Sequence, residues 1–167
     1  GDYPARAVYG KAKVLGHRVY TATYGAGNRF KSDVLILSNG RCDGLEPEIY
    51  FYGKKHVLLP QTVTGNEHAR YFVTDFGSNI EIRFYDGRAG QLADSQLVTA
   101  SASLGNPWGS TAKGTGLCYV VVTSDYNGEL FDKGVPEYEF ILRGLREYDP
   151  RLDSTVSGGS GPQRLNN

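Results

Sequence analysis

Charged residues cluster around a proline near the end of the chain, in the stretch "LREYDPRLDST". Carboxylates and arginines at this density raise the question of an acid–base or metal-binding cluster. The charges alternate in sign, however, and exposed pairs of this kind contribute little to stability. Asp149 is biased toward extended backbone by Pro150, which has no amide to donate to a strand. We therefore predict that this stretch is the exit from a domain.

Three other features contain residue types that suit ligand binding, but the spacing of these residues does not match the known phosphate, calcium or zinc motifs. In the glycine-rich loop 104–116, lysine precedes glycine in "AKGTG", whereas a phosphate-binding loop needs Gly-Lys-Ser/Thr before a helix. "DYNGELFDKG" starts like a calcium loop, but Leu130 and Pro136 stand where glycine and glutamate are required. The three histidines and two cysteines show no zinc spacing. We therefore predict no catalytic residue, no metal site and no cofactor site, and we expect the chain not to be an enzyme.

Aromatic residues are the more suggestive group, with twelve tyrosines and a single tryptophan, Trp108. A tyrosine ring supplies apolar area and a hydroxyl, which suits protein interfaces and sugar-stacking faces. Tyrosine also suits a half-buried strand, so the pattern leaves both interpretations open. The tyrosines that exceed the needs of a core are Tyr50, Tyr52, Tyr119, Tyr126, Tyr138 and Tyr148.

Alternation with a period of two dominates the segments that must position these residues. Residues 18–25, 79–87 and 137–144 alternate apolar with polar side chains, which predicts strands with one buried and one solvent-facing side. Residues 33–38 and 117–124 are apolar at successive positions and rich in β-branched residues. We predict that these two segments are central strands covered on both faces.

Turn signals separate the predicted strands. "SNGR" at residues 38–41 favours a tight hairpin, since Asn-Gly readily adopts positive φ, and "YGKKH" at 52–56 predicts a second tight connection. Leu92, Gln96, Leu97 and Ala100 fall near one face at spacings of about four residues, which indicates a helix. We predict a mainly β fold, an antiparallel barrel or sandwich-like domain with one short α-helix at about residues 90–101. A single β-rich domain would span residues 1–152, followed by a flexible Ser/Gly/Pro/Asn-rich tail or linker at 153–167.

Length and charge narrow the possible partners. The 167 residues, 40% of them hydrophobic, are enough for one domain with its own core. A formal net charge of zero argues against a nucleic-acid partner, and no apolar run approaches the roughly 20 residues of a membrane span. Cys42 and Cys118 are too few for a disulfide framework, so we expect buried thiols. Because the chain lacks methionine, we expect a processed product or a fragment.

Three segments, taken in order, carry a family resemblance. The first is "VLILSNGRCDGLEPEIYFYGKK", with Asp43 and Gly44 after the turn; the second is "GQLADSQLV", then Trp108 and "GTGLCYVVV". The third is "GVPEYEFILRGLREYDPRLDST", which contains Tyr-Asp-Pro-Arg. In this order they span about 120 of the 167 residues, from residue 34 to residue 155, and resemble the tail-tip attachment, or host-specificity, proteins of long-tailed bacteriophages and their prophage relatives.

The resemblance implies a structural role as one segment of a three-fold hub that closes the tail tube. The full-length protein would be a homotrimer at the virion tail tip, assembled in the bacterial cytoplasm, where thiols stay reduced. Its partners would be distal-tail and tail-tip proteins, with host receptors bound through regions outside this chain. The structural or interface candidates are Asp43, Gly44, Trp108, Tyr148, Asp149, Pro150 and Arg151. The alternative is a carbohydrate-binding β module that uses Trp108 and surface tyrosines.

Overall fold

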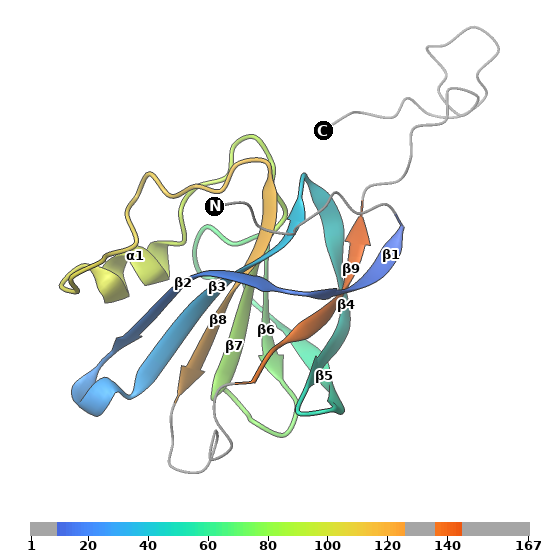
Figure 1. Cartoon of the computed structure of the whole chain (residues 1–167), viewed down its shortest axis with the longest axis horizontal. Coiled ribbons are helices and arrows are strands. Elements are labelled where there is room, and N and C mark those ends of the chain that lie inside the picture. The colour runs from blue at the N-terminus through green and yellow to red at the C-terminus, as the bar shows by residue number, and fades with distance from the viewer. Residues whose placement is uncertain (1–9, 126–135, 145–167) are drawn as a thin grey trace, which may run out of the picture.

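The computed structural model describes residues 10–125 and 136–144, which form one antiparallel sheet of nine strands and one short helix (Figure 1). The predicted fold class, mainly β and antiparallel with a short α-helix, is confirmed. The strand order is β1-β9-β4-β5-β6-β7-β8-β3-β2. The bounds are β1 (Lys11–Leu15), β2 (His17–Tyr24), β3 (Phe30–Asn39), β4 (Cys42–Phe51), β5 (Lys54–Gln61), β6 (Ala69–Val73), β7 (Ile80–Tyr85), α1 (Ser95–Ser101), β8 (Leu117–Asp125) and β9 (Glu139–Gly144).

The sheet curls into a half-barrel because its two edge strands, β1 and β2, are consecutive in the chain. Only Gly16 separates them, and Figure 1 shows them as one bent ribbon that crosses in front of the sheet. A Cβ added at Gly16 would lie 2.7 Å from Cβ of Leu35 on β3. The chain therefore passes close over β3 at the point where it changes its pairing from β9 to β3.

Two apolar clusters lie on opposite faces of the sheet, and alternate residues of β8 contribute to each. Val120 and Val122 belong to the inner cluster, inside the curl, together with Phe140 of β9. Tyr119 and Val121 belong to the outer cluster, which Leu97 of α1 covers. Strands β3 and β8 are thus buried on both faces, as their apolar runs predict.

Strand β7 corrects the prediction of one solvent-facing side. All six of its residues are buried, including Glu81 at 7% exposure and Arg83 at 1%. The second face is covered because α1 and the segment before it lie over it, and the charged side chains find partners there. The alternation correctly separated the two faces of β7 but did not show that both are enclosed.

The Asn39-Gly40 turn is not the hairpin that was predicted. Strand β3 pairs with β2 and β8, and β4 pairs with β5 and β9, so the turn joins two strands that do not pair with each other. The second tight connection, predicted at residues 52–56, is the hairpin between β4 and β5, where Tyr52 and Gly53 have φ of 52° and 69°. Positive φ at both central residues is the geometry of a type I′ turn.

Helix α1 begins at Ser95, five residues later than expected. Asp94 caps it: its backbone is extended and its carboxylate accepts a hydrogen bond from the Leu97 amide at 2.9 Å. Leu92, predicted on the buried face, lies before the helix and is 51% exposed. Over the described residues, no helix has the length and apolarity needed to cross a membrane.

Candidate functional site

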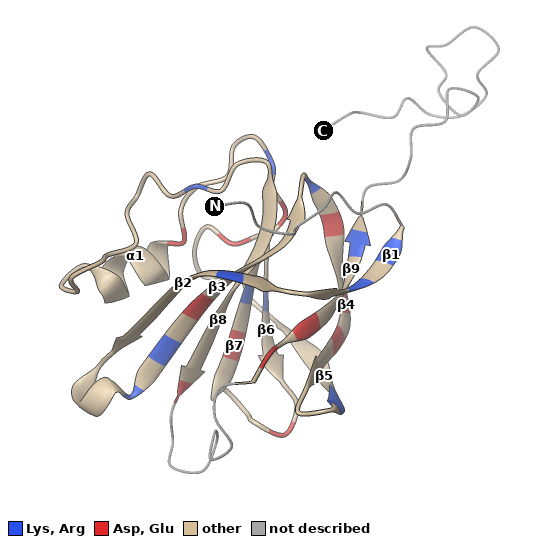
Figure 2. Ribbon diagram, in the orientation of Figure 1, with Lys and Arg blue, Asp and Glu red and all other residues tan. Residues whose placement is uncertain are grey.

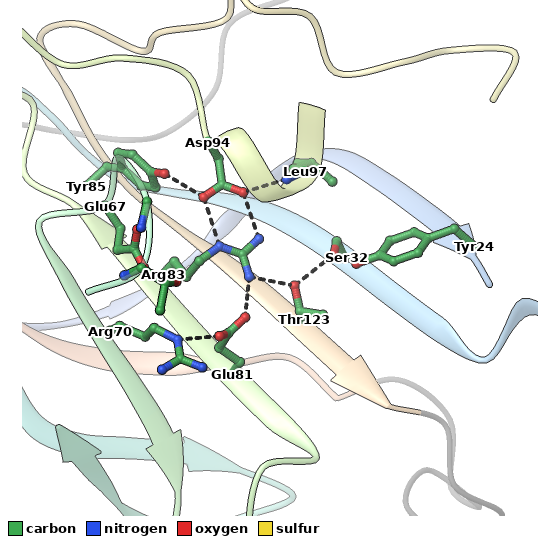
Figure 3. A network of polar contacts seen from close by, with 12 residues as sticks. Tyr24, Ser32, Glu67, Arg70, Glu81, Arg83, Tyr85, Asp94, Leu97 and Thr123 are labelled. Carbon is green, nitrogen blue, oxygen red and sulfur yellow. Dashed lines mark hydrogen bonds and ion pairs between the residues drawn. The ribbon is translucent and has the colours of Figure 1, made fainter. Parts of the chain in front are cut away.

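A connected set of buried polar side chains lies between α1 and the outer face of β7 and β8, and Figure 3 shows it from close by. We call this set the Arg83 network. Alternate positions of β7 supply three of its members, since residues 81, 83 and 85 share one face of the strand. The other members are Asp94 before α1, Arg70 of β6, Thr123 of β8, and Ser32 and Tyr24 of β3 and β2.

A bidentate ion pair between Arg83 and Asp94 forms the centre of the network. Nε of Arg83 donates to Oδ1 of Asp94 at 2.8 Å and Nη2 donates to Oδ2 at 2.7 Å, with side chains 1% and 2% exposed. Asp94 also accepts hydrogen bonds from the Tyr85 hydroxyl and the Leu97 amide. One carboxylate therefore neutralises a buried cation, caps α1 and attaches the helix to β7.

Glu81, Thr123 and Ser32 form one cross-strand row over β7, β8 and β3. Glu81 accepts from Nη1 of Arg83, and the same Nη1 donates to the Thr123 hydroxyl at 3.2 Å. The Thr123 and Ser32 hydroxyls lie 2.8 Å apart, and the Tyr24 hydroxyl lies 2.8 Å from Ser32. The row thus extends the network from the helix cap to a half-buried tyrosine at the end of β2.

The electrostatics of the network fix its protonation state. Burial opposes the charge of Arg83, but hydrogen bonding and attraction by Asp94 and Glu81 more than compensate and raise the pKa of its guanidinium. Burial, followed by the charge of Asp94, raises the pKa of Tyr85. The same two causes raise the pKa of Tyr119, whose ring stacks on Tyr85 at 4.6 Å. A general acid or base works best with a pKa near the operating pH, which these raised values do not favour. The Tyr85 hydroxyl donates to Asp94, whereas the buried Tyr119 hydroxyl has no hydrogen-bond partner among the described residues.

Two hollows flank the network, and Gln96 of α1 lines both. One, of about 350 Å³, is lined among others by Tyr24, Phe30, Arg70, Phe72, Asn79 and Glu81. The other, of about 450 Å³, is lined among others by Thr64, Glu67, Arg83, Asp94, Ser95 and Thr99. Gln96 borders both, and we call the two hollows together the α1 groove. The arginines that line the groove, Arg70 and Arg83, are paired with Glu81 and Asp94.

A second charged cluster lies at the end of β7, beside a hollow of about 290 Å³. Asp86 is buried and binds the Arg88 guanidinium, with Nη2 to Oδ2 at 2.7 Å and Nε to Oδ1 at 3.0 Å. Nη2 of Arg88 also contacts Nδ1 of His68. Burial opposes ionisation of Asp86, but the hydrogen bonds from Arg88 outweigh it and lower the pKa of the carboxyl.

The lowered pKa of Asp86 predicts a loss of stability in acid. A folded-state pKa below its ordinary value of 3.8 stabilises the fold fully above that pH, and the contribution is lost as the pH falls through the folded-state value. We expect Asp86→Asn to abolish this part of the dependence. Urea unfolding midpoints from pH 6 down to about pH 2.5 measure it. Exposed Asp43→Asn serves as the control, and an identical acid response in both variants would contradict the prediction.

Cys42 and Cys118 are both buried and free, in the inner cluster. A hydrogen bond between the thiols lowers the pKa of Cys42, while burial raises the pKa of Cys118. The Cys42 amide donates to the Asp86 carbonyl at 2.9 Å, which fixes the start of β4 beside the end of β7. Among the residues that the structure describes, no group of three or more His, Cys, Asp or Glu is arranged to hold a metal ion.

The candidate residues named from the sequence do not converge on one site. Asp43 is exposed, and Gly44 is buried where a Cβ would overlap the Arg143 guanidinium. Trp108 is half-buried in the outer cluster, with its ring 5.0 Å from that of Tyr20, so the indole anchors its loop to β2. The other four candidates lie outside the described residues: Tyr148, Asp149, Pro150 and Arg151.

The tyrosines divide between the core and the surface. Tyr119 and Tyr138 are each 2% exposed, so the expectation that they exceed the needs of a core is wrong. Tyr119 fills the space under α1, and Tyr138 packs edge-on against Phe51 in the inner cluster. Tyr50 is half-buried and Tyr52 is exposed in the hairpin turn. Tyr126 and Tyr148 lie outside the described residues.

Sequence reasoning missed the Arg83 network entirely. Glu81 and Arg83 alternate with apolar residues on β7, a pattern typical of a solvent face. Asp94 was included in the predicted helix, where it had no assigned role. The available signal was an aspartate three residues before Leu97, in the N-cap position of a short apolar helix segment, which indicates a helix start.

No protein-family model matches the chain, and no curated protein matches its sequence.

Proposed function

We propose that the chain is a structural segment of the tail tip of a long-tailed bacteriophage and acts through protein–protein contacts, not through catalysis. The observation that carries the proposal is the ordered resemblance of three segments to tail-tip attachment proteins. These segments contribute to strands that are neighbours in the sheet, since β3 pairs with β8 and β4 pairs with β9. Segments that are far apart in the sequence but pair in the sheet are what we expect if the resemblance reflects the fold of the tail-tip proteins.

The chemistry of the Arg83 network is compatible with a structural role for the chain. Charges of both signs are interspersed along the sheet, and β3 and β7 each carry both (Figure 2). The buried arginine has carboxylate partners, and the buried phenols of Tyr85 and Tyr119 have raised pKa values. Such an arrangement favours rigidity over proton transfer.

Exposed strands offer surfaces for assembly. Within the described residues β2 pairs only with β3, so its other edge presents unpaired backbone groups, and Val19 on it is 44% exposed. Val57 and Leu59 are also exposed, on β5. Strand pairing and aliphatic contacts are the means by which a neighbouring chain can bind such a surface. We propose a homotrimer in the full-length protein, with distal-tail and other tail-tip proteins as partners.

The location is tested by immunogold electron microscopy. Antibodies raised against this chain are applied to phage particles released from the bacterium that encodes it. We expect gold at the end of the tail distal to the head, in assembled virions. Pre-immune serum is the control, and gold on the heads or on no particle at all would contradict the tail-tip assignment.

The oligomeric state needs a separate measurement. Light scattering after size-exclusion chromatography gives the mass of the full-length protein without reference to its shape. We expect three chains. A mass of one chain at high protein concentration would refute the trimer.

A further inference from the structure

We propose that the α1 groove binds a neutral oligosaccharide. The groove lies over the Arg83 network, and Trp108 is not among its lining residues. Its proposed ligand function is additional to the tail-tip role and does not depend on it. Four properties of the groove support this ligand class: aromatic rings, paired charges, uncommitted polar side chains and an elongated shape.

Aromatic rings line one end of the groove. Tyr24 and Phe30 stack on each other with their centroids 5.9 Å apart, and Phe72 lies on the neighbouring side beneath the Arg70 guanidinium. All three rings are half-buried, so each keeps part of its surface open to the hollow. Partly exposed rings beside polar groups suit the C–H faces of a sugar, whose edges carry hydroxyl groups.

Each arginine at the groove is paired with a carboxylate. Arg70 binds Glu81, Arg83 binds Asp94 and Glu81, and Asp125 at the rim binds Arg29 through two hydrogen bonds of 2.7 and 2.8 Å. Glu67 accepts hydrogen bonds from the backbone amides of residues 64 and 65. A phosphate or carboxylate ligand would have to break one of the arginine pairs, at the cost of leaving a buried acid unpaired. The paired arginines therefore disfavour an acidic ligand, and a neutral one needs no charge partner.

Uncommitted polar groups border the same space. The side chains of Ser78, Asn79 and Gln96 make no hydrogen bond to any other described residue. A side-chain amide both donates and accepts hydrogen bonds. It can therefore bind the hydroxyl groups of two adjacent sugar carbons. Gln96 borders both hollows, so a ligand that contacts it can extend in either direction.

The dimensions favour a chain of several sugar units over a single ring. Gln96 lines both hollows, of about 350 and 450 Å³, and each alone is in the lower part of the range for small-molecule sites. Both are open to solvent along α1, which suits a ligand that lies across the surface. A rigid floor supports it, because the Arg83–Asp94 pair fixes the helix to β7.

Binding is tested with four tetrasaccharides: cellotetraose, maltotetraose, tetra-N-acetylchitotetraose and the acidic tetragalacturonate. Calorimetry at millimolar ligand measures affinity for the intact chain. We expect at least one neutral tetrasaccharide to bind and the acidic one to bind more weakly or not at all. Absence of binding by all three neutral probes, or preference for the acidic one, would overturn the proposal.

Three variants locate the site. Phe72→Ala removes a ring, and Gln96→Ala removes an exposed amide from α1 without disturbing the core, so it remains informative if Phe72→Ala fails to fold. We expect each to weaken binding about tenfold or more. Tyr50→Ala is the matched control, since it removes a half-buried strand ring that also lies beneath a cation, Lys13, outside the groove. Unchanged affinity in both groove variants, or an equal loss in the control, would refute the assignment.

Discussion

Replacing Asp94 with alanine is expected to lower the free energy of unfolding by about 3–5 kcal/mol. The substitution leaves the guanidinium of Arg83 buried with only Glu81 as a charged partner. It also removes the acceptor for the Leu97 amide, and with it the cap of α1. Urea denaturation followed by circular dichroism measures the change, and the slope of the transition shows whether unfolding stays two-state.

Two further variants separate the contributions of Asp94. Asp94→Asn keeps an oxygen that can cap α1 but removes the charge, so it should be less damaging than alanine by about 1 kcal/mol. Asp125→Ala removes the partner of Arg29, an arginine whose side chain is 57% exposed, and should have little effect. If Asp94→Ala is no more destabilising than Asp125→Ala, the Arg83 network does not hold α1 on the sheet.

Replacing Phe140 alone with alanine is expected to lower the free energy of unfolding by about 3–5 kcal/mol. Phe140 is fully buried on β9, between Val14 of β1 and Ile49 of β4. Truncation leaves a cavity inside the curl of the sheet. The cavity stays open because the strands around it are held by their pairing and cannot all move into it. The midpoint of thermal or urea unfolding reports the loss.

Ile141 provides the matched control for Phe140. It is the next residue of β9, points to the opposite face and is only half-buried. Ile141→Ala should therefore cost clearly less than Phe140→Ala. Equal losses would mean that the two faces of β9 are not differently buried, which the structure requires.

The Arg83 network links stability and the proposed ligand site. Its carboxylates and guanidinium groups neutralise one another, so the α1 groove has a polar floor without an unmatched arginine. Because Asp94 both caps α1 and binds Arg83, a change there should disturb the position of Gln96 as well as the fold. Gln96→Ala alone should weaken sugar binding without lowering stability, which distinguishes the two roles.

Strand content and strand faces were predictable because they depend on local pattern. The continuous apolar runs correctly predicted that β3 and β8 are covered on both sides. The alternation in β2 puts Tyr20 and Ala22 on the same face, and the structure buries both of them. Local preference was insufficient where pairing partners decided the outcome: Asn39-Gly40 suits a hairpin, but both edges of β3 are already occupied.

By itself, the sequence determined the antiparallel β class, the strand faces and a short helix with its apolar contact at Leu97. Only the tertiary structure decided that both faces of β7 are enclosed, that Tyr119 and Tyr138 belong to the core and that Asp94 meets Arg83. The physical reason is that side-chain alternation is set by the backbone geometry of a single strand. Whether a face meets water depends on segments that fold over it, and for β7 that segment includes α1 and the aspartate that caps it.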